Sequence, residues 1–207
     1  MPHDITIEPV EGLPELPPEG EKILWQGKPN WWALAKESLC LYWVMGYFVF
    51  LAMWRFIVLS DRVPLVQAFT ASLPFIILGL VACGLLALIA WVQSVTTMYT
   101  ITNRRVAMRI GAALTVTLNL PYTRIANADL DLRRSGTGTI TMELLEDKVQ
   151  LSYLMTWPHV RPWKFRTQPA LRCIPNAERV AAILADAADT QVSMPVIERA
   201  ASPVAAE

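Results

Sequence analysis

Residues 73–95 read LPFIILGLVACGLLALIAWVQSV, and this stretch decides the fold class of the chain. It lies within an uncharged run that extends from Val63 to Asn103. A bilayer core is about 30 Å thick, so a helix that rises about 1.5 Å per residue needs about 20 residues to cross it. Because the stretch reaches that length without a charge, it predicts a membrane-spanning helix.

A second apolar stretch precedes this one. Residues 38–54 carry no charged side chain, and after Arg55 the apolar character continues to Leu59. Only Asp61 and Arg62 are charged in the short connection between the two stretches. Together the stretches predict a two-span transmembrane helical hairpin over residues 33–96.

Basic residues lie on the same side of both predicted spans: Lys22, Lys28 and Lys36 before the first, and Arg104, Arg105 and Arg109 after the second. Positively charged flanks stay in the cytoplasm. We therefore expect a multi-pass membrane protein with both termini in the cytoplasm and the connection outside.

The two ends of the chain are predicted to lack a fold of their own. Residues 1–22 are rich in proline and acidic (Asp4, Glu8, Glu11, Glu15, Glu19 and Glu21), which is typical of a flexible arm. Residues 189–207 are expected to form a disordered tail. Residues 23–29 contain the apolar run Ile23-Leu24-Trp25, which predicts a short strand that docks on the domain after the hairpin.

Residues 97–188 change from continuous to alternating apolar character. The alternation recurs at Val106 to Ile110, Leu114 to Leu120, Leu130 to Leu132, Ile140 to Leu144 and Val149 to Tyr153. A period of two indicates strands with one buried face. A closing helix is predicted after Asn176, because Val180, Ile183, Leu184 and Ala187 share one helical face. Six or seven antiparallel strands capped by a C-terminal helix predict a cytoplasmic pleckstrin-homology-like (PH-like) β-barrel.

The sequence contains no constellation that would support catalysis. Its histidines are His3 and His159, no nucleophile elbow is present, and Gly136 and Gly138 stand between strands rather than in a phosphate loop. Cys40, Cys83 and Cys173 form neither a CxxC pair nor a ligand cluster and are expected to be free thiols. We expect a protein that is not an enzyme, with no cofactor, metal or nucleic-acid partner.

The segment from Trp157 to Trp163 is the candidate partner interface. Its residues, with two basic neighbours, are Trp157, His159, Arg161, Trp163, Lys164 and Arg166. Trp and Arg are enriched among residues that dominate binding energy, and the same composition suits an anionic lipid surface. The alternative is that the segment covers the open end of the barrel as a buried lid.

Small residues form a candidate packing face in the second span. Gly79, Cys83 and Ala87 are spaced by four and share one helical face. Small residues let helix backbones approach closely in lipid. This face is expected to pack on the first span of the same chain, or alternatively in a homodimer or against a partner's helix.

Several motifs resemble known proteins. The run Tyr99 to Val106 (YTITNRRV), with Gly111 and Thr123-Arg124-Ile125, resembles the bacterial membrane-anchored PH-like domains. Residues 20–27 (GEKILWQG), 157–163 (WPHVRPW) and 171–175 (LRCIP) are similar to the PuhB-type photosynthetic complex assembly proteins of purple bacteria.

This resemblance implies a non-enzymatic factor that helps to assemble the photosynthetic reaction centre and its core light-harvesting complex. It implies reaction-centre subunits and core antenna polypeptides as partners, in the intracytoplasmic photosynthetic membrane. His159 could in that setting ligate bacteriochlorophyll magnesium, but its position outside the spans favours a hydrogen-bonded histidine. The alternative function is a membrane-anchored PH-like sensor of lipid or peptide, unrelated to photosynthesis.

Overall fold

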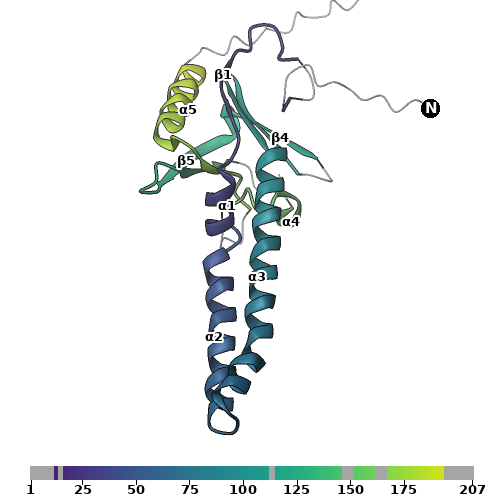
Figure 1. The fold of residues 1–207 in the computed structure, drawn as a ribbon. Coiled ribbons are helices and arrows are strands. Elements are labelled where there is room, and N and C mark those ends of the chain that lie inside the picture. Colours follow the sequence, from purple (N-terminus) through teal and green to yellow (C-terminus); the bar gives the residue numbers. More distant parts are fainter. Residues whose placement is uncertain (1–11, 14–15, 112–114, 146–151, 162–166, 194–207) are drawn as a thin grey trace, which may run out of the picture.

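The computed structural model describes residues 12–13, 16–111, 115–145, 152–161 and 167–193. Its elements follow in the order β1 (Ile23–Gly27), α1 (Trp31–Glu37), α2 (Leu41–Ser60), α3 (Leu65–Thr96), β2 (Met98–Thr102), β3 (Arg105–Ile110), β4 (Val116–Pro121), η1 (Tyr122–Arg124), β5 (Ile125–Leu132), β6 (Gly138–Leu144), α4 (Tyr153–Thr156), β7 (Ala170–Ile174) and α5 (Ala177–Val192). In Figure 1, α2 and α3 run side by side as a stalk, and the strands and α5 form a domain at one end of it.

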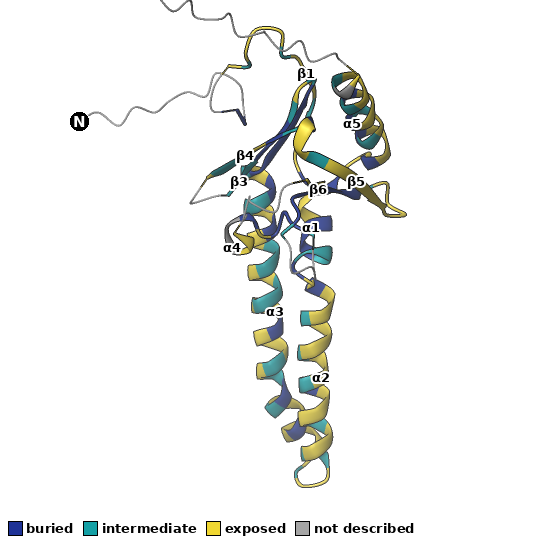
Figure 2. Cartoon of the chain, turned by 180° about the vertical axis from the view of Figure 1, so that it is seen from behind, coloured by how far each residue is buried: buried dark blue, intermediate teal, exposed yellow. Residues whose placement is uncertain are grey.

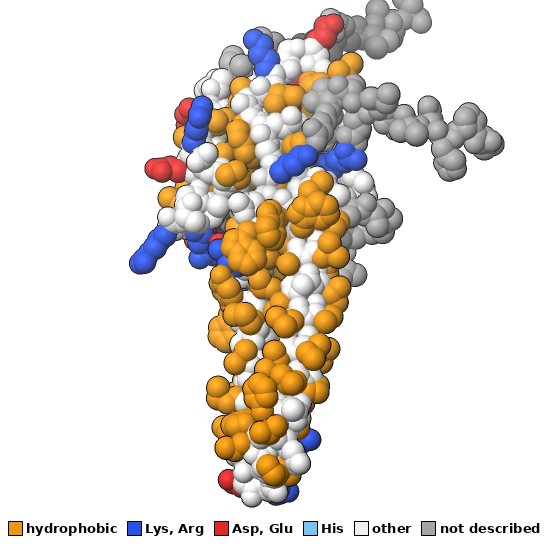
Figure 3. All heavy atoms as spheres, in the orientation of Figure 1, with side chains coloured by type: hydrophobic (Ala, Val, Ile, Leu, Met, Phe, Trp, Pro, Cys, Tyr) orange, Lys and Arg blue, Asp and Glu red, His pale blue; other side chains and the backbone are white. Residues whose placement is uncertain are grey.

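The stalk is the expected helical hairpin. Among the described residues, α2 and α3 are long and apolar enough to cross a membrane, and apolar side chains cover the outside of the stalk (Figure 3). The first span begins later than residue 33, because α1 is a separate helix. Asn30 caps α1 by accepting a hydrogen bond from the Ala33 amide at 3.0 Å. Cys40, at a left-handed φ of 54°, separates α1 from α2.

The first sheet contains four antiparallel strands in the order β1-β2-β3-β4. The strand expected at residues 23–29 is β1, and it pairs with β2 in a register that sets Trp25 opposite Ile101. The hairpin is therefore inserted between two neighbouring strands of one sheet. Every residue of β2 is buried, so the strand that follows the hairpin lies at the centre of the domain.

The second sheet contains three antiparallel strands in the order β5-β6-β7, and η1 links it to the first. Buried side chains from both sheets and α5 form one core, which includes Tyr99, Met108, Ile140, Leu171 and Val180. The described strands form two separate sheets rather than the closed barrel that we predicted. The PH-like order of strands followed by a C-terminal helix is confirmed.

Three predicted boundaries differ from the structure. Tyr153 begins the short helix α4 instead of ending a strand, and the last strand is β7 at residues 170–174. Residues 149–151 of the expected strand lie outside the described residues. The closing helix continues to Val192, so the tail cannot begin at residue 189. The arm is not free throughout its described part, because Leu13 is only 2% exposed.

Candidate functional site at the junction of hairpin and domain

The hairpin and the domain meet in a buried junction. The Asn30 amide donates a hydrogen bond to the Cys173 carbonyl at 2.8 Å, and the Ser94 hydroxyl donates to the Pro29 carbonyl. Ala33, Leu34 and Ala35 in the middle of α1 are buried, whereas the neighbouring α2 is mostly exposed (Figure 2). These contacts fix the start of α1 to β7 and the end of α3 to Pro29, so the domain is held on the stalk.

A polar network occupies the centre of this junction. The Tyr99 hydroxyl accepts a hydrogen bond from the Arg172 amide at 3.3 Å and lies 2.5 Å from His159 Nδ1. Thr97 Oγ1 lies 3.1 Å from His159 Nε2. All partners are satisfied if Tyr99 donates to Nδ1 and the Nε2 hydrogen is donated to Thr97. The network thus joins the first residues after α3 to the 157–161 segment and β7.

Burial decides the charge state of this network. Burial is the main cause that lowers the pKa of His159 to about 3, and the positive charge of Arg172 is the second. Burial also raises the pKa of Tyr99 far above its ordinary value. Both side chains are therefore neutral at physiological pH, and the network acts as a structural connection.

Arg172 is the charged member of this polar network. Its side chain is buried, and its Nη1 donates to the Pro158 carbonyl at 3.3 Å. Within the described part of the chain, its Nε has no hydrogen-bond partner. Burying an arginine costs free energy, and the hydrogen bond to the Pro158 carbonyl offsets part of that cost.

A second connection lies at the end of α1. Glu37 Oε2 is 3.4 Å from Arg133 Nε and 3.8 Å from Cys173 Sγ. Burial, followed by the charge of Glu37, raises the pKa of the Cys173 thiol to about 12. Cys173 is therefore an inert thiol, because the thiolate is the reactive form.

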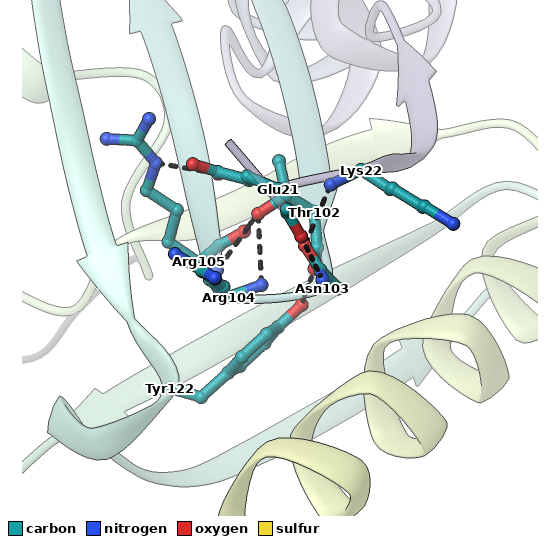
Figure 4. Close-up of polar contacts among 8 residues, drawn as sticks. Glu21, Lys22, Thr102, Asn103, Arg104, Arg105 and Tyr122 are labelled. Atoms are coloured by element: carbon teal, nitrogen blue, oxygen red, sulfur yellow. Dashed lines mark hydrogen bonds and ion pairs between the residues drawn. The ribbon is translucent and has the colours of Figure 1, made fainter. Parts of the chain in front are cut away.

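The far end of the first sheet fixes the segment before β1, as Figure 4 shows. Asn103 donates through Nδ2 to the Gly20 carbonyl at 3.0 Å and accepts at Oδ1 from the Lys22 amide at 2.9 Å. Arg105 Nε donates to Glu21 Oε1 at 2.9 Å, and the Glu21 side chain is 2% exposed. Residues 20–22 are thus part of the domain, which corrects the expectation that the arm is flexible up to residue 22.

The turn beneath these contacts is held by side chains too. Thr102 Oγ1 accepts hydrogen bonds from the Arg104 and Arg105 amides at 3.2 and 3.0 Å. The Tyr122 hydroxyl donates to the Thr102 carbonyl at 2.7 Å. Burial, followed by the Glu21 charge, raises the pKa of Tyr122, so it remains a donor. The motif that carried the sequence resemblance therefore stabilises the domain.

The structure separates the residues of the candidate partner interface. Trp157 is 37% exposed, and Arg161, partly exposed, pairs with Asp129 at 3.0 Å. His159 is fully buried between them, so its place in an exposed interface is wrong and a hydrogen-bonded histidine is correct. Trp163, Lys164 and Arg166 lie outside the described residues.

The small-residue face of α3 points into the hairpin. A Cβ on Gly79 would lie 2.7 Å from Phe48 Cβ of α2, so only glycine fits this approach. Cys83 packs against the cluster of Ala35, Leu39, Leu41 and Ala90. Ala87 is partly buried. The intrachain packing that we expected is therefore formed by Gly79 and Cys83.

The described residues contain no group of three or more His, Cys, Asp or Glu side chains that could hold a metal ion. Sequence reasoning missed the partners of His159, namely Thr97, Tyr99 and Arg172. A signal for them existed, since Tyr99 and Arg172 both belong to motifs that carried the resemblance. What the sequence could not supply was their contact across about 60 to 70 residues.

An apolar helical hairpin inserted into a two-sheet domain with a C-terminal helix defines a PH-like protein with two candidate membrane spans. Residues 44–188 match the family described as "Bacterial PH domain", and the chain belongs to this family. The chain is 44% identical over 198 residues to a protein of Rhodobacter capsulatus described as "Uncharacterized 23.7 kDa protein in puhA 5'region"; the match covers 94% of this chain and 92% of that protein. No solved structure matches the chain.

Proposed function

We propose that this protein is a non-enzymatic membrane assembly factor for the photosynthetic reaction centre and the core light-harvesting complex. One observation carries the proposal: the Rhodobacter capsulatus relative, similar over nearly its whole length, is described by its position beside puhA, a photosynthesis gene. The PuhB-type motifs of the sequence agree with it. The protein acts through contacts with reaction-centre subunits and core antenna polypeptides and carries no cofactor of its own.

The fold suits a scaffold in the photosynthetic membrane. Large apolar side chains such as Trp43, Phe50 and Leu80 are exposed on the hairpin, so lipid or the helices of other membrane proteins must cover them. The buried junction holds the domain beside these helices. With both termini in the cytoplasm, the domain meets the cytoplasmic faces of the subunits that the hairpin accompanies.

We assign partner binding to Trp157, which is exposed, and to Arg161, which is partly exposed. In cells growing photosynthetically, tagged wild-type protein should co-purify with reaction-centre subunits. The double variant Trp157→Ala/Arg161→Ala should bind them at least about tenfold more weakly at unchanged abundance. The matched control Leu145→Ala/Arg134→Ala removes an exposed apolar and a basic residue elsewhere on the domain and should bind normally.

A deletion strain tests the function itself. Loss of an assembly factor should lower the amounts of the photosynthetic complexes, whereas loss of a PH-like sensor unrelated to photosynthesis should not. We expect the deletion to lower reaction-centre and core-antenna absorbance, with restoration by the wild-type gene. Normal amounts of both complexes in the deletion strain would contradict the proposal and favour the sensor.

A further inference from the structure

A hollow of about 160 Å³ lies where the first sheet meets the end of α3. Its lining includes Lys28, Val95, Thr96, Met98, Arg109 and Thr115. Lys28 follows β1, Val95 and Thr96 end α3, and Met98 begins β2. Arg109 lies near the end of β3, and Thr115 precedes β4. The hollow therefore lies at the end of the first sheet where the chain enters and leaves the hairpin.

The charge of the hollow favours an anion. Lys28 and Arg109 are the charged side chains among its described lining residues, and no carboxylate belongs to that set. Arginine offers a planar fork of donors that matches phosphate oxygens, and lysine adds a mobile point charge. Each of the two also makes a further interaction, so a bound anion would join or displace an existing contact.

The height of the hollow on α3 matches the headgroup layer of a membrane. Trp91, half-exposed one turn before the hollow, is a residue type that prefers the membrane interface. From Trp91 to Thr96 the helix rises about 7 to 8 Å. The headgroup region adds about 5 to 7 Å to each side of the hydrocarbon core. Long Lys and Arg side chains at this height can reach lipid phosphates.

We propose that the hollow binds the phosphate of an anionic phospholipid whose acyl chains remain in the adjacent leaflet. The inference rests on the membrane placement proposed above, and it holds whether or not the protein assembles photosynthetic complexes. The volume suits a headgroup, since pockets that enclose whole small molecules are about 300 to 1,000 Å³. Arg109 holds the phosphate oxygens, and Lys28 supplies the second charge.

Native mass spectrometry of the full-length protein in detergent tests the site. The protein is titrated separately with phosphatidylglycerol, phosphatidylcholine and inorganic phosphate. The variant Lys28→Gln/Arg109→Gln is compared with Arg55→Gln/Arg62→Gln, which removes the same charge at the opposite end of the hairpin. We expect the wild type and the control to prefer phosphatidylglycerol, and the first variant to bind it at least about tenfold more weakly.

Three results would overturn the site: no preference of the wild type for phosphatidylglycerol, equal binding by both variants, or inorganic phosphate binding as tightly as the lipid. Equal melting temperatures of the two variants must accompany the expected result. Carbonate extraction of membranes distinguishes a failure of the membrane placement from a failure of the headgroup site. Release of the wild type would contradict the membrane placement, whereas lost lipid preference in a protein that stays in the membrane would contradict only the headgroup site.

Discussion

Apolar side chains point outward from the hairpin but inward in the domain. In β2 all five residues are buried, whereas in the 20 residues of α2 the buried ones are Leu41 and Ala52. In the domain, burial away from water holds the strands together. In the hairpin, helix contact depends on small residues such as Gly79. The comparison shows that α2 and α3 expose the apolar side chains that the domain buries, which is the arrangement that a hairpin placed in lipid requires.

The largest expected effect comes from equal truncations in the two regions. Leu171→Ala removes a fully buried side chain from the domain core and should lower the free energy of unfolding by about 2 to 5 kcal/mol. Leu80→Ala removes the same atoms from the outside of α3, where Leu80 is 69% exposed, and should change it by less than about 1 kcal/mol. Thermal unfolding of the domain in lipid nanodiscs measures both, and similar losses would contradict the comparison.

A charge deletion at the far end of the domain should have the next largest effect. Arg105→Ala leaves the Glu21 carboxylate buried without its partner, which should cost about 3 kcal/mol. Arg104→Ala is the matched control, because the Arg104 side chain is exposed one residue away. Equal melting temperatures for the two variants would show that Glu21 does not tie residues 20–22 to the domain.

The junction between the two regions should make stability depend on pH. In the unfolded chain His159 takes up a proton below about pH 6.5, but in the folded protein its pKa is about 3. Between these values the unfolded state binds more protons, so stability falls as the pH is lowered, by up to about 1.4 kcal/mol per unit. His159→Asn should reduce this slope between pH 6.5 and 4.5. An unchanged slope in the variant would mean that His159 is not held neutral.

The smallest expected effect is at the surface of the domain. Arg161→Ala breaks the ion pair with Asp129, in which both side chains are partly exposed. Such pairs contribute about 0 to 1 kcal/mol, so the melting temperature should barely change. A loss as large as that of Leu171→Ala would show that Arg161 belongs to the core of the domain instead of its accessible surface.

The sequence predicted the features that depend on local pattern. The lengths of the apolar stretches gave the hairpin, the period of two gave most strands, and the face of Val180 and Leu184 gave α5. The pairing of β1 was predicted because the Ile23-Leu24-Trp25 run had no local partner. The strand at 170–174 was missed, because Ala170 and Arg172 are buried there without an apolar alternation.

The candidate site was less predictable, because its properties come from long-range contacts. The sequence does not show that Trp157 is exposed and His159 buried, because the two residues lie in the same short segment. The position of Tyr99 decides the role of His159, and 60 residues of sequence separate them. The prediction of a closed barrel was also wrong. The alternation of apolar residues shows which face of a strand is buried, but it does not show which strands pair to join two sheets.

The orientation of the hairpin tests the central claim most directly. With Cys40, Cys83 and Cys173 replaced, single cysteines are introduced by Val63→Cys between the two long helices and by Thr190→Cys in the last turn of α5. We predict that a membrane-impermeant thiol reagent applied from the periplasm labels Cys at position 63 alone, and that position 190 reacts only after the membrane is opened. Labelling of both positions in intact cells, or of position 190 alone, would contradict a two-span anchor that holds the PH-like domain in the cytoplasm.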